Sequence, residues 1–233
     1  MDRNLLERLN AARAARTAAA VVTDLGTGQG QLVLEGESVA GELGEEVSAR
    51  FRSGKAGIVE MGGGSHFINV YLPPPRVVII GAVHISQALC PMARIAGFDV
   101  SVIDPRTAFA TPDRFEGVDL VADWPEDVLK ARPLDAYTAV AAVTHDPKID
   151  DFPLAEALRT GCFYVGALGS RKTHAKRVER LAAEGFGPEQ IGRISAPIGL
   201  DIGAANPGEI AVAVLADIIG AFRRRGLAAG EAA

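Results

Sequence analysis

Short apolar runs alternate with amphipathic stretches over the last two thirds of the chain. Residues 77–80 and 139–143 are unbroken runs of valine, isoleucine and alanine, and 100–103 is an apolar stretch interrupted only by Ser101. Such stretches are typical of strands buried on both faces of a parallel sheet. A helical pattern over 85–96 separates 77–80 from 100–103, and Gly97 suits the end of that helix. The order of strand, glycine turn, helix and strand predicts an α/β fold, a Rossmann-like parallel sheet with helices on both faces.

The remaining pattern completes this prediction. It indicates further strands at 120–122, 163–165 and 194–196, and helices at 125–131 and 151–159. Asn206 and Pro207 are start signals for a last helix, whose apolar stripe predicts packing against the core. We expect that helix to end in the arginine run that precedes Gly226.

The amino-terminal part has a different pattern. It predicts a helix over 3–16, a hairpin of strands 20–22 and 31–34, a helix over 45–51, and a second hairpin of strands 58–61 and 67–72. Three consecutive prolines at 73–75 can continue neither a sheet nor a helix. We therefore predict a small amino-terminal α+β domain of residues 1–74 and a Rossmann-like domain of residues 75–233.

Composition narrows the functional classes. The 233 residues carry a net charge of −5 and no basic stripe, so we expect no nucleic-acid partner. No uncharged apolar segment approaches the length of a membrane span, and the amino terminus lacks the apolar core of a signal peptide. The two cysteines form neither a disulfide framework nor a C-x-x-C motif. We expect a soluble protein of the reducing cytoplasm.

The first strand-to-helix turn, which begins at Gly81, departs from the dinucleotide fingerprint G-x-G-x-x-G. Val83 and Ser86 occupy the second and third glycine positions, and a β-branched side chain there opposes the close approach of a pyrophosphate. Asp104 is nevertheless well placed to accept a hydrogen bond from a ribose hydroxyl, and Arg106 could meet a phosphate. An NAD(P) site therefore stays open as an alternative.

A second turn, from Gly169 to Thr173, is suited to an anion. Gly169 lets the turn close, Ser170 can cap the next helix, and the first helical amides then point outward. Arg171 and Lys172 add positive charge where a plain cap more often has acidic residues. The alternative is a capped helix with basic residues on a solvated face.

Other polar residues follow the predicted strands. His84, His145 and His174 fall at or just after strand ends, which places them on one rim of the sheet. Asp146 begins a charged segment predicted to be a loop, and Asp201 is an acid of buried appearance in a loop near the last helix. These residues form no evident pair of nucleophile and base, and their spacing gives no metal motif.

Five separated motifs, within about residues 75–222, carry a resemblance to a known family. They are Gly81-Ala82-Val83-His84-Ile85, Asp104-Pro105-Arg106, Thr144-His145-Asp146, Gly166-Ala167-Leu168-Gly169-Ser170-Arg171, and the segment 196–204 with Pro207-Gly208-Glu209-Ile210-Ala211. In these residues the chain resembles the XdhC/CoxI family of accessory proteins for molybdenum hydroxylases. Many members have Gly-x-Gly-His at the first turn, and their amino-terminal half is longer than residues 1–72 here.

The resemblance implies a maturation factor without catalytic residues. Such a protein binds molybdopterin, the molybdenum cofactor, as cargo, holds it for sulfuration by a cysteine desulfurase, and assists its insertion into a xanthine dehydrogenase-type molybdenum hydroxylase; a homodimer is implied as well. We expect no resident metal. The cofactor-binding residues expected are Gly81, Ala82, Val83, His84, Asp104, Arg106, His145, Asp146, Gly169, Ser170, Arg171, Lys172, Thr173 and Asp201. The alternatives are an NAD(P)-dependent oxidoreductase and a nucleotide-binding regulatory subunit.

Overall fold

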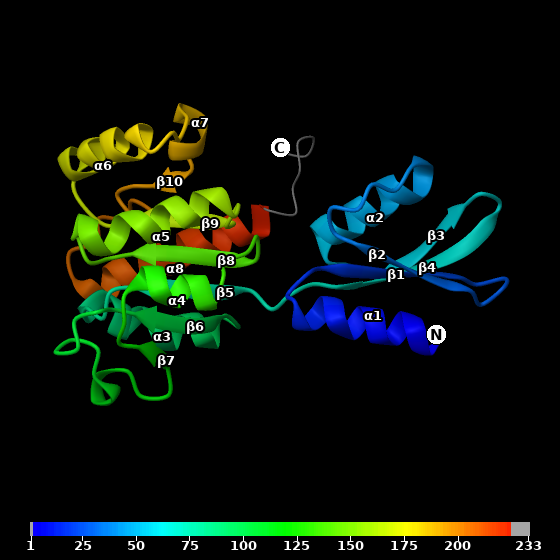
Figure 1. The fold of residues 1–233 in the computed structure, drawn as a ribbon, viewed down its shortest axis with the longest axis horizontal. Coiled ribbons are helices and arrows are strands. Elements are labelled where there is room, and N and C mark those ends of the chain that lie inside the picture. The colour runs from blue at the N-terminus through cyan, green and yellow to red at the C-terminus, as the bar shows by residue number, and fades with distance from the viewer. Residues whose placement is uncertain (1, 225–233) are drawn as a thin grey trace. The chain divides into compact units, whose positions relative to one another are not determined.

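The structure, a computed structural model, describes residues 2–224, which form two compact units (Figure 1). Residues 2–73 with Arg223 and Arg224 make the first unit, and Pro74–Phe222 make the second. The division falls inside the run of three prolines, where the backbone lacks the N–H donors that a sheet needs. That residues 1–74 and 75–233 are separate domains stays a prediction, and residues 1 and 225–233 lie outside the described range.

The first unit has a four-stranded antiparallel sheet of order β2-β1-β4-β3. Its elements are α1 (Arg3–Ala14), β1 (Ala19–Asp24), β2 (Gly30–Leu34), α2 (Gly41–Ser53), β3 (Gly57–Met61) and β4 (Gly64–Tyr71). Asp2 caps α1 by accepting a hydrogen bond from the backbone N–H of Leu5 at 2.8 Å. Leu5 and Leu9 then pack with Val21 and Leu32 of the sheet. Both predicted hairpins are present.

The second unit has a six-stranded sheet in which every pair of neighbours is parallel, of order β10-β9-β8-β5-β6-β7. Its elements are β5 (Arg76–Ile80), α3 (His84–Ile95), β6 (Asp99–Ile103), η1 (Pro112–Arg114), β7 (Asp119–Val121), α4 (Pro125–Ala131), β8 (Thr138–Ala142), α5 (Pro147–Arg159), β9 (Tyr164–Ala167), α6 (Arg171–Ala183), α7 (Pro188–Ile191), β10 (Ile194–Ser195) and α8 (Pro207–Arg224). The chain starts at β5, winds outward to β7, and returns to β8 on the other side of β5. This doubly wound order confirms the Rossmann-like prediction.

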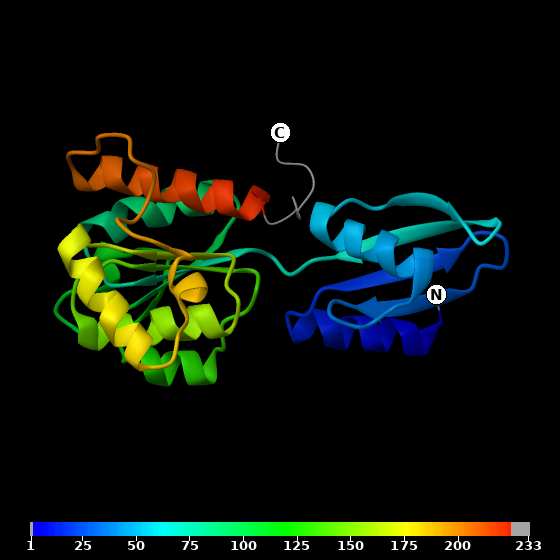
Figure 2. The same ribbon diagram turned by 90° about the horizontal axis from the view of Figure 1, so that it is seen from above.

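Helices cover both faces of the six-stranded sheet (Figures 1 and 2). Val78 and Ile80 of β5 point into a core shared with α4, α5, α6 and α7. Val77 and Ile79 point to the other face, where α3 and α8 pack. These four side chains are at most 4% exposed, and burying one such side chain stabilises the fold by roughly 1.5–3 kcal/mol.

Three local features differ from the prediction. The charged segment that begins at Asp146 is not a loop, because Asp146 caps α5 by accepting from the backbone N–H of Lys148 at 3.0 Å. The short helix α7 has no counterpart among the predicted elements. The predicted end of the last helix at Gly226 lies outside the described residues, of which Arg224 is the last. Among the described helices, none combines the length and apolar character needed to cross a bilayer.

Candidate functional site

The first turn, between β5 and α3, lies where the strand order reverses. Gly81 adopts φ +116, and a Cβ atom there would lie 2.7 Å from the Cγ2 atom of Thr144 in the turn after β8. Only glycine allows this backbone and this close approach. The two turns are therefore packed against each other at the carboxyl ends of β5 and β8, the place where open α/β sheets bind ligands.

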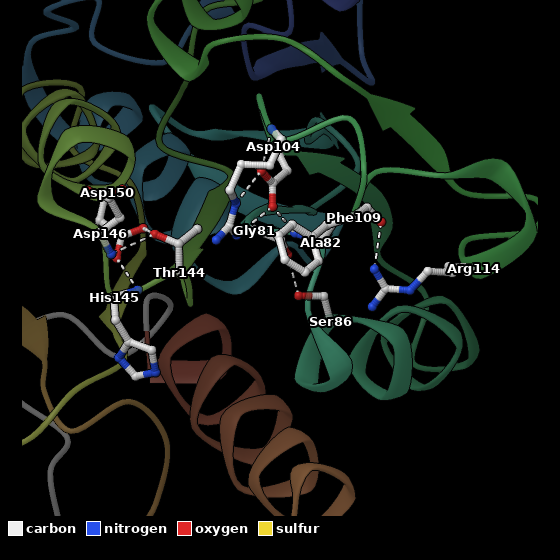
Figure 3. Close-up of polar contacts among 11 residues, drawn as sticks. Gly81, Ala82, Ser86, Asp104, Phe109, Arg114, Thr144, His145, Asp146 and Asp150 are labelled. Atoms are coloured by element: carbon white, nitrogen blue, oxygen red, sulfur yellow. Dashed lines mark hydrogen bonds and ion pairs between the residues drawn. The ribbon is translucent and has the colours of Figure 1, made fainter.

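Asp104 closes the first turn from within (Figure 3). Its fully buried carboxylate accepts a hydrogen bond from the Ala82 backbone N–H at 2.7 Å. It also accepts three from Arg106, through the backbone N–H and Nε at 2.9 Å and Nη2 at 2.8 Å. Burial alone would raise the pKa of Asp104, but the hydrogen bonds from Arg106 and Ala82 outweigh it and hold the pKa below its usual value.

This closure bears on two expectations. The two Asp104 carboxylate oxygens already accept four hydrogen bonds, so Asp104 does not present a free acceptor to a ribose hydroxyl. Arg106 is held by Asp104 through Nε and Nη2, but its side chain is 33% exposed, and a phosphate contact of Arg106 stays a prediction. The Ala82 N–H, which would face a pyrophosphate in a dinucleotide fold, is already bonded. Ser86, in the third glycine position, is buried and donates its hydroxyl hydrogen to the Gly81 carbonyl oxygen.

An aromatic ring lies beside this closed turn. The guanidinium carbon of Arg106 is 4.7 Å from the centroid of the Phe109 ring, a cation–π contact. Phe109 is 44% exposed. Arg114 fixes its backbone by donating from Nη1 to the Phe109 carbonyl oxygen at 2.7 Å. An exposed aromatic ring with a fixed backbone therefore lies next to the first turn, and sequence reasoning did not identify it.

The turn after β8 is organised by a buried acid, Asp150 in the first turn of α5 (Figure 3). Its carboxylate accepts from the Thr144 hydroxyl at 2.7 Å and from the His145 backbone N–H at 3.1 Å. These bonds hold His145 at φ +66, a conformation that non-glycine residues rarely adopt. Asp150 is 1% exposed, and this burial raises its pKa to about 6 although the Thr144 hydrogen bond opposes the shift.

The turn after β9 confirms the predicted cap. Ser170 accepts from the Thr173 backbone N–H at 3.2 Å, and Gly169 adopts φ +135. Arg171 and Lys172 are exposed, and within the described part of the chain neither side chain has a hydrogen bond or ion pair. The turn thus offers capped helical amides and two solvated cations.

Sequence reasoning missed a cation on the inner side of the same helix. Arg177 is 2% exposed and donates from Nη2 to the Leu168 carbonyl oxygen at 3.2 Å. Its Nε and Nη1 are buried and have no hydrogen-bond partner in the structure, and the same is true of His174 Nδ1. A buried polar group without a partner costs about 1–3 kcal/mol, and a charged one costs more. Arg177 lies four residues before the buried Leu181, and that helical spacing marks the inner face of α6.

Charges of both signs surround Arg177. Burial lowers the pKa of this guanidinium, and Asp150 and Asp151 oppose that shift. Burial and then the charge of Arg177 lower the pKa of both His145 and His174. Asp151 is paired with Arg180, so it is less available to Arg177. The two histidines and the arginine share one electrostatic environment at the carboxyl ends of β8 and β9.

Other predicted residues belong to other segments of the second unit. His84 is the exposed first residue of α3, and Val83 is the N-cap of that helix without a side-chain cap bond. Asp201 is exposed in the loop between β10 and α8, so its expected burial is wrong. Within residues 2–224, no cluster of three or more histidine, cysteine or acidic side chains is arranged to hold a metal ion.

With this geometry established, comparison with known proteins identifies the family. A family model described as the XdhC Rossmann domain matches residues 77–218. The chain belongs to the XdhC family. A crystal structure described as a xanthine dehydrogenase from Bacillus halodurans is similar, with a TM-score of 0.66 and 26% identity, over 97% of this chain and 68% of that one.

Three curated relatives cover similar shares of the chain. YqeB of Escherichia coli K12, named an uncharacterized protein, is 31% identical over 66% of this chain and 29% of its own length. A Bacillus subtilis 168 protein named as a probable xanthine dehydrogenase subunit is 33% identical over 68% and 46%, respectively. The molybdenum cofactor insertion chaperone PaoD of E. coli K12 is 29% identical over 64% and 40%. The chain thus spans less than half the length of these relatives.

Proposed function

We propose that this XdhC-family protein is a maturation factor that binds the molybdenum cofactor and assists its insertion into a xanthine dehydrogenase-type molybdenum hydroxylase. Two relatives, one named for molybdenum cofactor insertion and one for xanthine dehydrogenase, support this role. The observation that carries the proposal is the closed first turn, since the Ala82 N–H and the Asp104 carboxylate are unavailable to a dinucleotide. Sulfuration of the bound cofactor by a partner cysteine desulfurase, a homodimeric state and a cytoplasmic location belong to the same proposal.

The carboxyl ends of β8 and β9 suit such a cargo. Molybdopterin combines a phosphate with a flat pterin that carries hydrogen-bonding edges. The capped start of α6 and its two exposed cations, Arg171 and Lys172, can attract the phosphate. His145 and Asp146 are neighbours in the turn after β8, and their side chains can form hydrogen bonds with one edge of the pterin. The exposed ring of Phe109 can stack on the flat face of the pterin. A carrier must release its cargo, and these are all reversible contacts.

A binding experiment separates this proposal from the NAD(P)-dependent alternative. The purified protein is titrated calorimetrically with molybdopterin and, separately, with NADH and NADPH. We expect stoichiometric binding of molybdopterin and no binding of either dinucleotide at micromolar concentrations. Failure to retain molybdopterin would refute the proposal, and micromolar NADH or NADPH binding would favour the oxidoreductase.

Charge removal at α6 tests the predicted phosphate contacts. The double variant Arg171→Ala with Lys172→Ala should weaken molybdopterin binding by about 1–3 kcal/mol, the scale of lost charge-assisted hydrogen bonds. Lys176→Ala is the matched control, because it removes an exposed cation one turn further along the same helix. Equal affinities of the double variant and the control would show that the exposed cations do not hold the phosphate.

A further inference from the structure

The inner face of α6 has donors without acceptors. Arg177 is 2% exposed, yet Nε and Nη1 have no hydrogen-bond partner, and neither does Nδ1 of His174 one turn earlier. A buried guanidinium normally has its donors paired, because its charge was removed from water. Arg177 makes one hydrogen bond, to the Leu168 carbonyl oxygen at the end of β9. That bond places the guanidinium at the carboxyl edge of the sheet, where ligands of such sheets bind.

The surrounding charges select the ligand class. The pKa values of His145 and His174 are lowered partly by Arg177, so all three groups share one electrostatic environment. The Asp150 carboxylate balances Arg177 only in part, since the charges influence each other without forming an ion pair within 4.0 Å. The missing component is therefore an acceptor with negative charge and several oxygen atoms. A phosphate-type oxyanion satisfies this requirement, because it accepts from arginine and from a neutral imidazole N–H at the same time.

We propose that Arg177 and His174 form a binding site for a phosphate-class oxyanion at the carboxyl end of β9. This site is distinct from the exposed cations Arg171 and Lys172, which lie on the solvated side of the helix start. The anion is either free phosphate or the phosphate of a bound cofactor. Its assignment to the cofactor rests on the proposed function, whereas the anion site itself does not.

Inorganic phosphate is the direct probe. Phosphate is titrated into the full chain by calorimetry at pH 7 in a chloride buffer of constant ionic strength, and thermal unfolding is followed with and without phosphate. We expect Arg177→Met to lower phosphate affinity at least tenfold and His174→Gln to lower it about three- to tenfold. Lys176→Met, which removes an exposed cation from the same helix, should change the affinity less than twofold.

Arg177→Met also distinguishes a ligand site from a structural role. Methionine keeps an apolar stem and removes the buried unpaired charge, so the variant should unfold without phosphate at a temperature equal to or above that of the parent. It should lose the rise in unfolding temperature that phosphate gives the parent. A variant that unfolds earlier yet binds phosphate normally would show that Arg177 only supports Leu168. If Arg177→Met does not fold, Arg177→Lys replaces it in the experiment. The lysine variant should bind phosphate more weakly than the parent, because one ammonium group replaces the planar set of guanidinium donors.

Molybdopterin with and without its phosphate group identifies the source of the anion. If the cofactor supplies the anion, phosphatase treatment should weaken binding to the parent more than binding to Arg177→Met, which retains only the exposed cations Arg171 and Lys172. If the protein binds phosphate but not molybdopterin, the anion site is supported and the proposed function is refuted. If the Arg171/Lys172 double variant loses phosphate binding while Arg177→Met binds phosphate normally, the proposed site at Arg177 and His174 is refuted.

Discussion

Replacing Asp150 by asparagine should remove a specific part of the pH dependence of stability. Asp150 is buried, and its pKa is about 6 in the folded protein against an ordinary value of 3.8. A carboxyl group whose pKa is raised by folding contributes stability at low pH, and that contribution is lost as the pH rises through the folded pKa. The difference of about two pKa units corresponds to about 3 kcal/mol over the whole window.

Urea unfolding at pH 4.5 and pH 7.5 measures this effect. Through Asp150 alone, the parent should lose about 2 kcal/mol of unfolding free energy between these two values. The asparagine of Asp150→Asn cannot ionise, so the variant does not lose this free energy. Its unfolding free energy relative to that of the parent should therefore rise by about 2 kcal/mol from pH 4.5 to pH 7.5. Any cost of its altered hydrogen bonds is the same at both pH values and does not affect this difference. Other titrating groups cancel because both proteins contain them. Asp99→Asn, at the exposed start of β6, is the control and should show no such change. A parallel pH dependence of Asp150→Asn and the parent would refute the reasoning.

Three further results are expected. Asp104→Asn should destabilise the protein by about 2–4 kcal/mol in urea at pH 7, because an NH2 group would face donors of the first turn; a cost like that of the surface control would contradict this. Gly81→Ala, with its φ of +116 and a contact of 2.7 Å, should cost at least about 2 kcal/mol, whereas Gly97→Ala, with open space around it, should cost about 1 kcal/mol. Burial raises the thiol pKa of Cys90 to about 12 and of Cys162 to about 11, so mass spectrometry should detect alkylation of both at pH 7.5 in urea and of neither in the native protein.

The sheet was predictable because its information is local. The apolar stretches at 77–80 and 100–103 contain mostly β-branched residues, and Gly81 and Gly97 mark where β5 and α3 end. Helix starts are harder to predict. The start of α2 has no side-chain cap hydrogen bond at Ala40, so the sequence contains no capping signal. The start of α5 does have one, Asp146 followed by Pro147, but the charges around it also suit a solvated loop.

The sheet edge at which the polar residues gather could be predicted, but their contacts could not. Polar residues that directly follow parallel strands lie at one edge of the sheet, because parallel strands end on the same side. The partner of each polar group depends on contacts that sequence spacing does not specify. Asp104 is bonded to an amide 22 residues earlier, and Arg177 to a carbonyl oxygen nine residues earlier. The exposed Arg171 was evident as a helix-start cation, whereas Arg177 occupies a position where helical periodicity leads one to expect an apolar residue.

The hydrogen bond between Ala82 and Asp104 also has a consequence for competition among ligands. Cells contain abundant dinucleotides, and an open Rossmann turn is a general receptor for them. Here the amide is bonded to a charged acceptor at 2.7 Å, so an incoming pyrophosphate would first have to break a bond worth about 1.5–3 kcal/mol. That requirement reduces affinity by about ten- to a hundredfold without any steric obstacle. The Asp104 side chain thus competes with dinucleotides for the amide of the first turn.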